Sequence, residues 1–183
     1  LLFFSTQKPE PPLLSGLVGS EMCIRDSMLA TAKHFPGHGD TETDSHSSLA
    51  RIPSDEKRLW STELRPFQAA IEAGVDAVMI SHVNAPGYQF NADIPATLSK
   101  FCVTEILKDS LGYKGIVVTD AMAMGGITNN YSDAYALIES IKAGCDLIIQ
   151  NDDFIGSVDI IERAVLDGEI SEERINSSAL KLR

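Results

Sequence analysis

The 183-residue sequence lacks a long apolar run and has only three cysteines. No hydrophobic stretch approaches the roughly 20 residues that a membrane-spanning helix needs, and the N-terminal LLFF is too short, with no basic region before it, to be a signal peptide. Cys23, Cys102 and Cys145 show no close pairing pattern and lie in apolar surroundings. We therefore expect no membrane span, and we expect reduced core cysteines rather than a disulfide framework or a zinc ribbon.

Basic residues are scarce as well. The chain has 15 Lys and Arg against 26 Asp and Glu, which gives a formal net charge of -11. A nucleic-acid surface requires clustered positive charge, so this acidic excess excludes a nucleic-acid partner and suits a neutral or cationic ligand. The sequence MGGI, from Met124 to Ile127, lacks the further Gly and Lys of the common phosphate-binding loops, so we expect no nucleotide cofactor.

The first 27 residues carry little structural signal. They show neither strand alternation nor a sustained helical period, and the part LVGSEMCIRDS resembles translated sequencing-adapter text. The chain also begins with Leu rather than Met. We expect residues 1–27 to be a non-native or disordered leader and residues 28–183 to form the folded domain.

Two passages of the remaining sequence match each other, AIEAGVDAVMISH at residues 70–82 and SIKAGCDLIIQND at residues 140–152. In each, a helical segment ends at a Gly suited to the left-handed cap, Gly74 or Gly144, and an apolar run of strand length follows. Two more strands are expected at residues 28–34 and 115–120, and a helix that Gly112 ends is expected between residues 97 and 112.

Continuous apolar strands that alternate with helices are typical of βαβ units in a parallel sheet. We therefore predict an α/β fold with about four βα units, which is the C-terminal half of a (β/α)8 TIM barrel and, by its length, a fragment of one. The polar residues KH, SH, TD and QND follow the four strands. Because parallel strands end at the same edge of a sheet, these groups are expected to converge on one face.

The segment KHFPGHGDTETDSH, residues 33–46, holds three of the four histidines, and its Pro and Gly residues predict an ordered loop rather than a helix. Asp44 lies two residues before His46, close enough to orient the imidazole for general acid/base catalysis. The alternative for this pair is an Asx-turn with an exposed histidine. Zinc binding by His34, His38, Asp44 and His46 is another alternative, which we do not favour because no HExxH helix or comparable spacing is present.

Four more residues are candidate site residues. Asp120 follows the apolar strand GIVVT and is a candidate nucleophile or, alternatively, a helix N-cap. Lys33 and His34 can donate hydrogen bonds to ligand hydroxyls, or they form a salt bridge at the strand end. His82 lines the pocket or caps the following loop.

The segments KHFPGHGDTETDSH and GIVVTDAMAMGGI together resemble the catalytic barrel of glycoside hydrolase family 3, and the DSH element resembles its β-N-acetylglucosaminidase (β-N-acetylhexosaminidase) branch. The resemblance covers roughly residues 28–183. It implies that Asp120 is the nucleophile and that Asp44 and His46 form the acid/base pair. It also implies that Lys33 and His34 contact the sugar, and we add His82 as a further substrate contact.

The resemblance implies a retaining hydrolase that releases terminal β-linked N-acetylglucosamine through a covalent glycosyl-aspartate intermediate. From the missing nucleotide-loop and metal-ligand patterns we expect neither a cofactor nor a metal. The expected substrates are cell-wall or chitin-derived saccharides, and the expected compartment is the cytoplasm or periplasm of a bacterium. One alternative is a phosphorylase of the same branch, which would use phosphate in place of water. Another is a non-catalytic sugar-binding protein or an inactive barrel fragment. The sequence leaves the oligomeric state open.

Overall fold

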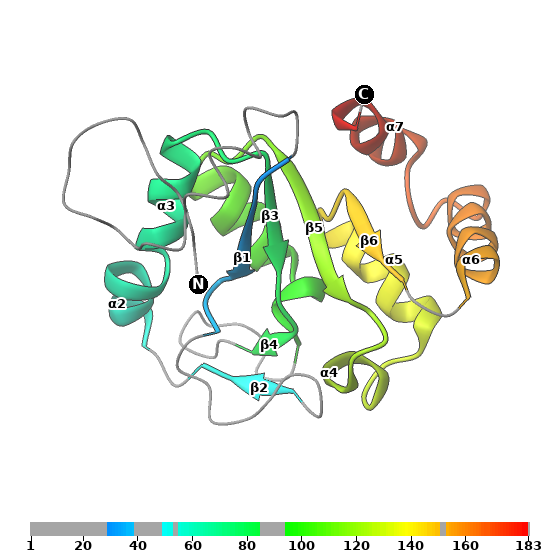
Figure 1. The fold of residues 1–183 in the computed structure, drawn as a ribbon. Coiled ribbons are helices and arrows are strands. Elements are labelled where there is room, and N and C mark those ends of the chain that lie inside the picture. Colours follow the sequence, from blue (N-terminus) through cyan, green and yellow to red (C-terminus); the bar gives the residue numbers. More distant parts are fainter. Residues whose placement is uncertain (1–28, 39–48, 53–54, 85–93, 151–152, 183) are drawn as a thin grey trace.

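The computed structural model describes residues 29–38, 49–52, 55–84, 94–150 and 153–182. Within these residues the centre of the fold is a four-stranded parallel sheet with the order β1-β3-β5-β6. The strands are β1 (Thr31–Phe35), β3 (Ala77–Ile80), β5 (Ile116–Ala121) and β6 (Leu147–Ile149). Their order in the sheet is their order in the chain, and helices follow each strand (Figure 1).

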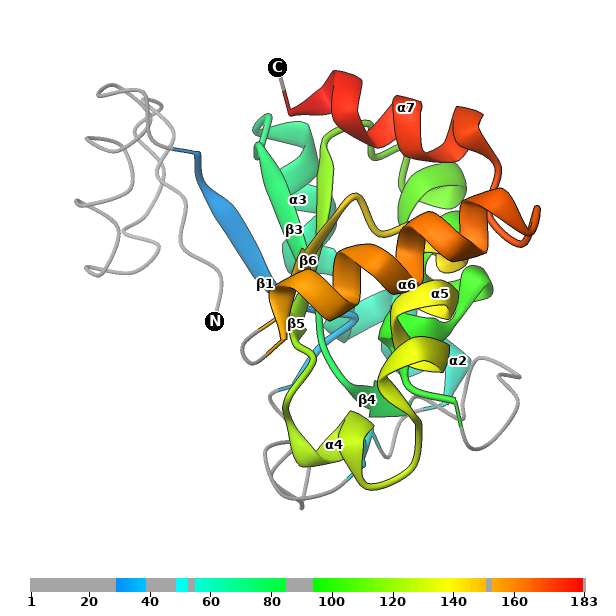
Figure 2. The same ribbon diagram turned by 90° about the vertical axis from the view of Figure 1, so that its right-hand side faces the viewer.

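The helices differ in length and type. They are α2 (Glu56–Arg58), η1 (Leu59–Glu63), α3 (Arg65–Glu72), η2 (Ala96–Leu98), η3 (Phe101–Ser110), α4 (Gly125–Thr128), α5 (Asp133–Ala143), α6 (Phe154–Leu166) and α7 (Glu172–Lys181). Two short strands, β2 (Ala50–Arg51) and β4 (Val83–Asn84), pair with each other in a separate two-stranded sheet. Figure 2 shows α5 beside the sheet and α6 running past β6. The predicted α/β fold with four βα units is therefore confirmed, and this arrangement corresponds to half of a (β/α)8 barrel.

The repeated helix-to-strand joint has the same hydrogen bonds in both copies. Gly74 and Gly144 adopt positive φ angles of 82° and 120°. The N–H of Val75 donates to the carbonyl of Ala70, and the N–H of Cys145 donates in the same way to that of Ser140. This bond, from the residue after the glycine to the last turn of the helix, defines a Schellman cap. At the positive φ angles of Gly74 and Gly144, a residue with a Cβ would strain the backbone.

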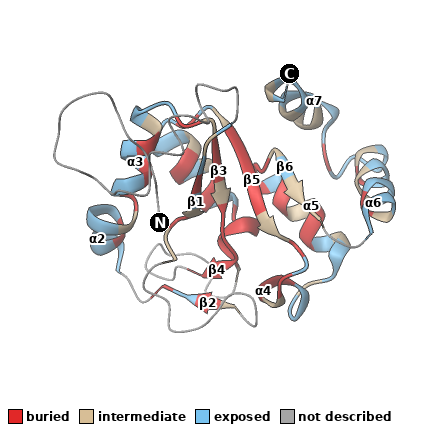
Figure 3. Ribbon diagram, viewed as in Figure 1, coloured by how far each residue is buried: buried red, intermediate tan, exposed pale blue. Residues whose placement is uncertain are grey.

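The main core lies between the sheet and the helices that cover it. Phe35 of β1 packs edge-to-face against Phe67 of α3, with ring centroids 5.0 Å apart. Figure 3 shows β3 and β5 as largely buried, whereas α6 and α7 are largely exposed. Cys102 and Cys145 are buried and free, as expected, and burial raises the pKa of the Cys145 thiol to about 12. Cys23 and the predicted leader, residues 1–27, lie outside the described residues.

Among the described helices, none combines the length and the apolar character that a membrane crossing requires.

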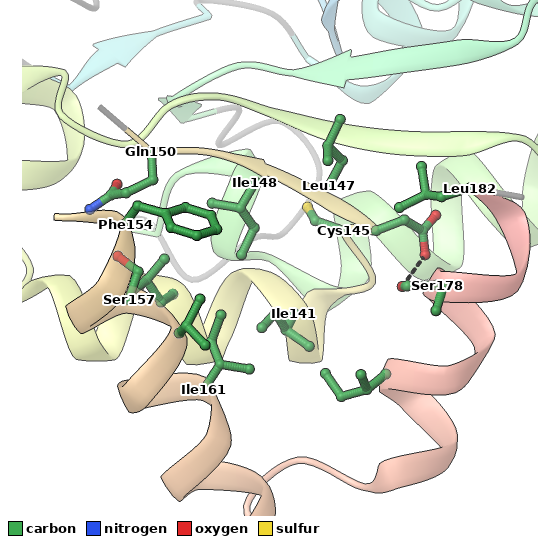
Figure 4. Close-up of a pocket in the computed structure, with 15 residues that line it drawn as sticks. Ile141, Cys145, Leu147, Ile148, Gln150, Phe154, Ser157, Ile161, Ser178 and Leu182 are labelled. Carbon is green, nitrogen blue, oxygen red and sulfur yellow. Dashed lines mark hydrogen bonds between the residues drawn. The ribbon is translucent and has the colours of Figure 1, made fainter. Parts of the chain in front are cut away.

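An apolar pocket of about 300 Å³ lies between α5, β6, α6 and α7 (Figure 4). Its lining includes Ile148, Phe154 and Ile161, but none of the site residues predicted from the sequence.

A buried carboxylate, Asp146, holds α7 against the sheet. Its Oδ1 accepts hydrogen bonds from Ser178 (2.8 Å, Figure 4) and from Arg174 (3.2 Å). Its Oδ2 accepts from Lys181 Nζ (2.8 Å) and from the backbone N–H of Val117 in β5 (3.1 Å). Burial alone would favour the neutral acid, but the hydrogen bonds from Lys181 and Ser178 outweigh it and hold the pKa of this carboxyl below its ordinary value.

We expect Asp146→Ala to lower the free energy of unfolding by about 3 kcal/mol, because it removes the counter-ion of Arg174 and Lys181 and the acceptor of the Val117 N–H. The lower end of the usual range applies, since Arg174 and Lys181 are partly exposed and water replaces part of the interaction. Urea unfolding followed by circular dichroism measures the loss. The exposed Asp159→Ala on α6 is the matched control, and equal stability of the two variants would refute the anchoring role.

Candidate active site

The predicted site residues of β1, β3 and β5 gather at the C-terminal edge of the sheet. Phe35 of β1 pairs in register with Ile80 of β3, and Ile80 pairs with Thr119 of β5. His34 and Asp120 each lie one residue from this aligned row. The parallel register therefore brings together two side chains that are far apart in the sequence, as the strand-end pattern predicted.

Asp120 lies at the end of β5 with its carboxylate partly buried. Its Oδ1 accepts a hydrogen bond from the N–H of Ala121 (2.8 Å), and its Oδ2 lies 3.7 Å from Nε2 of His34. The helix-capping alternative does not hold, because α4 begins after Met124 and no side chain caps it. One carboxylate oxygen is thus oriented by the backbone while the other faces the imidazole.

His34 is held next to Asp120 as a half-buried imidazole. Burial is the largest influence on its pKa and lowers it, the Asp120 carboxylate acts against burial, and Lys33 and His38 lower the pKa further. The ring is therefore mainly neutral at pH 7, and one nitrogen donates while the other accepts. At 3.7 Å the contact with Asp120 is too long for a hydrogen bond, so both groups retain the capacity to bind a third partner.

Lys33 precedes His34 in β1 and is exposed. The peptide bonds Lys33–His34 and Phe35–Pro36 are both cis. Lys33 thus lies beside the candidate site, and its contact with a ligand remains a prediction.

The predicted acid/base pair, Asp44 and His46, lies outside the described residues. The segments on either side of it are described. His38 follows the end of β1, and Ala50 begins β2, which pairs with β4 through Ala50–Val83. Since β4 follows His82, both ends of this segment attach near the C-terminal edge of the main sheet.

His82 takes a different place from the expected sugar contact. Its side chain is fully buried, with Nδ1 2.8 Å from the hydroxyl of Thr97 and Nε2 3.0 Å from the carbonyl oxygen of Ala121. Both ring nitrogens are occupied by protein atoms, so neither is available to a ligand. Its position after a strand predicted the correct edge of the sheet. The direction of its ring depends on η2, which packs against it from a distant part of the chain.

Sequence reasoning placed Ser81 at the strand end but gave it no role, and it did not identify Thr97; both are buried beside His82. Single serine and threonine residues carry no spacing signal, so only their packing around the histidine distinguishes them.

Lowered pKa values of His34 and His82 predict a loss of stability in mild acid. Burial is the largest cause in both cases, so the unfolded chain binds more protons than the folded chain between the two pKa values. The free energy of unfolding therefore rises with pH in this window. The contribution is complete above about pH 6.5 and is lost as the pH falls through the lowered folded pKa values.

Urea unfolding between about pH 7.5 and about pH 5.5 measures this dependence. His82→Gln, which does not titrate, should show a shallower decrease than the wild type. A wild-type free energy of unfolding that stays constant over this range would contradict the expectation.

The structure describes two of the four residues of the zinc alternative, His34 and His38. Among the described residues, no three His, Cys, Asp or Glu side chains are grouped so as to hold a metal ion. His34 and His38 lie close together, with ring centroids 5.9 Å apart, but Asp44 and His46 of the same set lie outside the described residues.

Comparison with known structures gives the same fold at substantial sequence identity. A glycoside hydrolase family 3 beta-N-acetylglucosaminidase from Paenibacillus sp. is 40% identical, with a TM-score of 0.81 over 86% of this chain and 31% of that one. Zn-bound CbsA from Thermotoga neapolitana is 34% identical, with a TM-score of 0.80 over 85% of this chain and 34% of that one. The beta-glucoside phosphorylase BglX is 26% identical, with a TM-score of 0.82 over 87% and 30%.

Curated relatives named beta-hexosaminidase are 30% to 38% identical to this chain, which spans 29% to 46% of their length. The model of the glycosyl hydrolase family 3 N-terminal domain matches residues 13–183. This match covers nearly the whole chain and includes the strand ends that carry His34 and Asp120. The chain therefore belongs to glycosyl hydrolase family 3, and residues 13–183 match the N-terminal domain of that family.

Proposed function

We propose that this chain provides the catalytic residues of a retaining β-N-acetylglucosaminide hydrolase. The observation that carries the proposal is the Asp120 carboxylate at the C-terminal end of β5, oriented by the Ala121 N–H and facing a half-buried imidazole. Relatives named beta-hexosaminidase and the Paenibacillus beta-N-acetylglucosaminidase support the substrate class.

Asp120 acts as the nucleophile. A carboxylate oxygen attacks the anomeric carbon while the glycosidic oxygen leaves, which forms a glycosyl ester with inversion at that carbon. The Ala121 N–H holds Oδ1, so the carboxylate already has a defined orientation before substrate binds. Water then cleaves the ester with a second inversion, and the product retains the β configuration.

His34 and Lys33 bind the sugar. A neutral imidazole next to Asp120 can donate a hydrogen bond to one hydroxyl or accept one, without pairing the nucleophile with a positive charge. If His34 were protonated, its charge would stabilise the Asp120 carboxylate and make it a weaker nucleophile. The lowered pKa of His34 therefore suits its place beside a nucleophile at neutral pH.

His46 transfers the proton, and Asp44 orients the imidazole of His46. An imidazole with a reference pKa of about 6.5 can protonate the leaving oxygen and then deprotonate water near neutral pH. A neutral base also avoids a second negative charge beside Asp120. The substrates are N-acetylglucosamine-containing glycosides such as cell-wall or chitin-derived saccharides.

Hydrolysis of nitrophenyl β-N-acetylglucosaminide tests the proposal. Because the relatives are longer, we would measure both this chain and a chimaera in which it replaces the aligned part of the Paenibacillus enzyme. Proton NMR of the first product should show the β anomer. An α anomer as first product, or a chimaera with no turnover at all, would refute the proposal.

A phosphorylase is the second candidate, and the similarity to the beta-glucoside phosphorylase BglX favours it. Phosphate would attack the same glycosyl-aspartate in place of water, and the product would be a sugar 1-phosphate. Phosphorus NMR of reactions with and without phosphate separates the two. We expect free N-acetylglucosamine in both, and a sugar 1-phosphate as main product would establish the phosphorylase.

Zinc removal is expected to leave the hydrolytic rate unchanged, because the proposed histidines bind sugar and transfer protons. The similarity to Zn-bound CbsA makes the measurement necessary. Dialysis against a chelator, followed by metal analysis and the nitrophenyl assay, provides it. A rate that falls with zinc content and returns on adding Zn²⁺ would refute the acid/base assignment in favour of a metal site.

A further inference from the structure

A chain of buried hydrogen bonds links the ends of β1 and β5. The carbonyl oxygen of Phe35, next to His34, accepts hydrogen bonds from both the N–H and the hydroxyl of Ser81, each 2.9 Å long. The carbonyl of Ser81 accepts from the Thr97 hydroxyl (2.9 Å), which also contacts Nδ1 of His82. Nε2 of His82 reaches the carbonyl of Ala121, next to Asp120.

Most of the link is shielded from solvent, and only its end at Ala121 is partly buried. Phe35, Ser81, His82 and Thr97 are each 0% exposed. Water does not reach these four side chains to replace a lost bond, so each of them has a strong effect on the geometry of the others.

The proton arrangement of His82 follows from its acceptor. A carbonyl oxygen only accepts, so Nε2 must carry the hydrogen. In the neutral ring Nδ1 then accepts from the Thr97 hydroxyl, which shares its one hydrogen with the Ser81 carbonyl. Burial, the largest influence, lowers the pKa of His82, so the neutral ring dominates at pH 7 although the Ala121 carbonyl and Asp120 oppose the shift. A protonated ring keeps the same Nε2–H bond.

Ala121 connects this link to the candidate nucleophile. Its N–H donates to Asp120 Oδ1 (2.8 Å), and its carbonyl accepts from His82 and from the N–H of Met124 (3.1 Å). The residue that orients the Asp120 carboxylate is thus itself held on its other side by His82.

We propose that His82 is a positioning residue whose Nε2–H bond to the Ala121 carbonyl sets the orientation of the Asp120 carboxylate relative to His34. His82 does not touch the sugar. The proposal rests on the role of Asp120 as nucleophile. Its consequence is that His82 governs the rate of attack more than the binding of substrate, because a small displacement of a reacting group can cost about 10²-fold in rate.

Two substitutions separate this role from simple core filling. The amide nitrogen of glutamine can reach the place of Nε2, whereas that of asparagine can reach only the place of Nδ1. His82→Gln therefore keeps a donor for the Ala121 carbonyl, and His82→Asn keeps a partner for Thr97. Both replace an aromatic ring by an amide, so both create a void in the core.

We expect His82→Asn to lower kcat about 10²-fold with KM changed less than about threefold, and His82→Gln to stay within about tenfold of the wild-type kcat. Thermal melts identify any difference in folding. Equal kcat values for the two variants at equal melting temperature would overturn the proposal. If neither variant folds, Thr97→Ser and Thr97→Val make the same comparison, because only the serine keeps the hydroxyl that holds the imidazole.

Amide hydrogen exchange in the 183-residue chain provides a readout that does not need turnover. The Ala121 N–H should exchange faster in His82→Asn than in His82→Gln, because only the asparagine variant removes the side-chain hydrogen bond to the Ala121 carbonyl. Equal exchange rates in the two folded variants would also overturn the proposal. A wild-type protein that protects this N–H but hydrolyses no glycoside would refute the proposed function and not the link between His82 and β5.

Discussion

Asp120→Ala is expected to abolish formation of the covalent glycosyl-enzyme and to lower kcat by at least about 10⁴-fold. The substitution removes the carboxylate that attacks the anomeric carbon, and no other carboxylate is described within reach of His34 Nε2. Trapping with a fluorinated N-acetylglucosaminide, followed by intact-mass analysis, measures the intermediate in the chimaera. An alanine variant that still labels at the wild-type stoichiometry would show that Asp120 is not the nucleophile.

Added azide tests the same assignment from the product side. In Asp120→Ala azide can take the place of the carboxylate and displace the leaving group in one step, so a β-glycoside should yield an α-glycosyl azide. Asp109→Ala, an exposed aspartate at the end of η3, is the matched control and should label and turn over as the wild type does. A β-glycosyl azide from Asp120→Ala would mean that the nucleophile is still in place.

His46→Ala is expected to slow substrates with poor leaving groups far more than activated ones. A nitrophenol leaves with little protonation, whereas the oxygen of a natural disaccharide needs a proton from the acid. We expect a loss of about 10²- to 10⁴-fold for the disaccharide and a much smaller loss in the first step for the nitrophenyl glycoside. Lys33→Ala should impair both substrates more evenly, because it removes a binding contact.

Asp44→Ala should resemble a weaker form of the His46 loss, about 10²-fold, since the imidazole remains without its orienting partner. The double variant then decides whether the two residues act as a unit. We expect its loss to be close to that of His46→Ala alone. Losses that simply multiply, or one common factor for both substrates in His46→Ala, would reduce this segment to a binding element.

The structure describes Asp120, the residue of the first prediction, but not Asp44 and His46, the residues of the second. Its place after an apolar run made Asp120 a candidate, and the family resemblance favoured it as the nucleophile; the structure places its carboxylate at the expected edge, 3.7 Å from His34 Nε2. Asp44 and His46 lie outside the described residues, so their pairing rests on sequence spacing and family resemblance alone. The double variant is therefore the stronger test of what the sequence predicted.

Local sequence signals by themselves determined most of the architecture. The glycines of the repeated joint, Gly74 and Gly144, predicted where helices end, because a left-handed cap is a property of one residue and its neighbours. Apolar runs predicted the four strands within a few residues, and alternation with helices predicted the parallel sheet. The family motifs predicted Lys33, His34 and Asp120 as site residues from order and spacing, which are properties of the chain alone, and their roles stay predictions.

Tertiary structure alone decided what each of these side chains faces. His82 follows a strand as predicted, but Thr97 of η2 and the carbonyl of Ala121 in β5 occupy both nitrogens of its ring. The same long-range packing placed the Asp146 carboxylate under Arg174 and Lys181 of α7. Sequence patterns report which face of an element is apolar. The partner of a buried polar group comes from a distant segment, so only the assembled fold determines it.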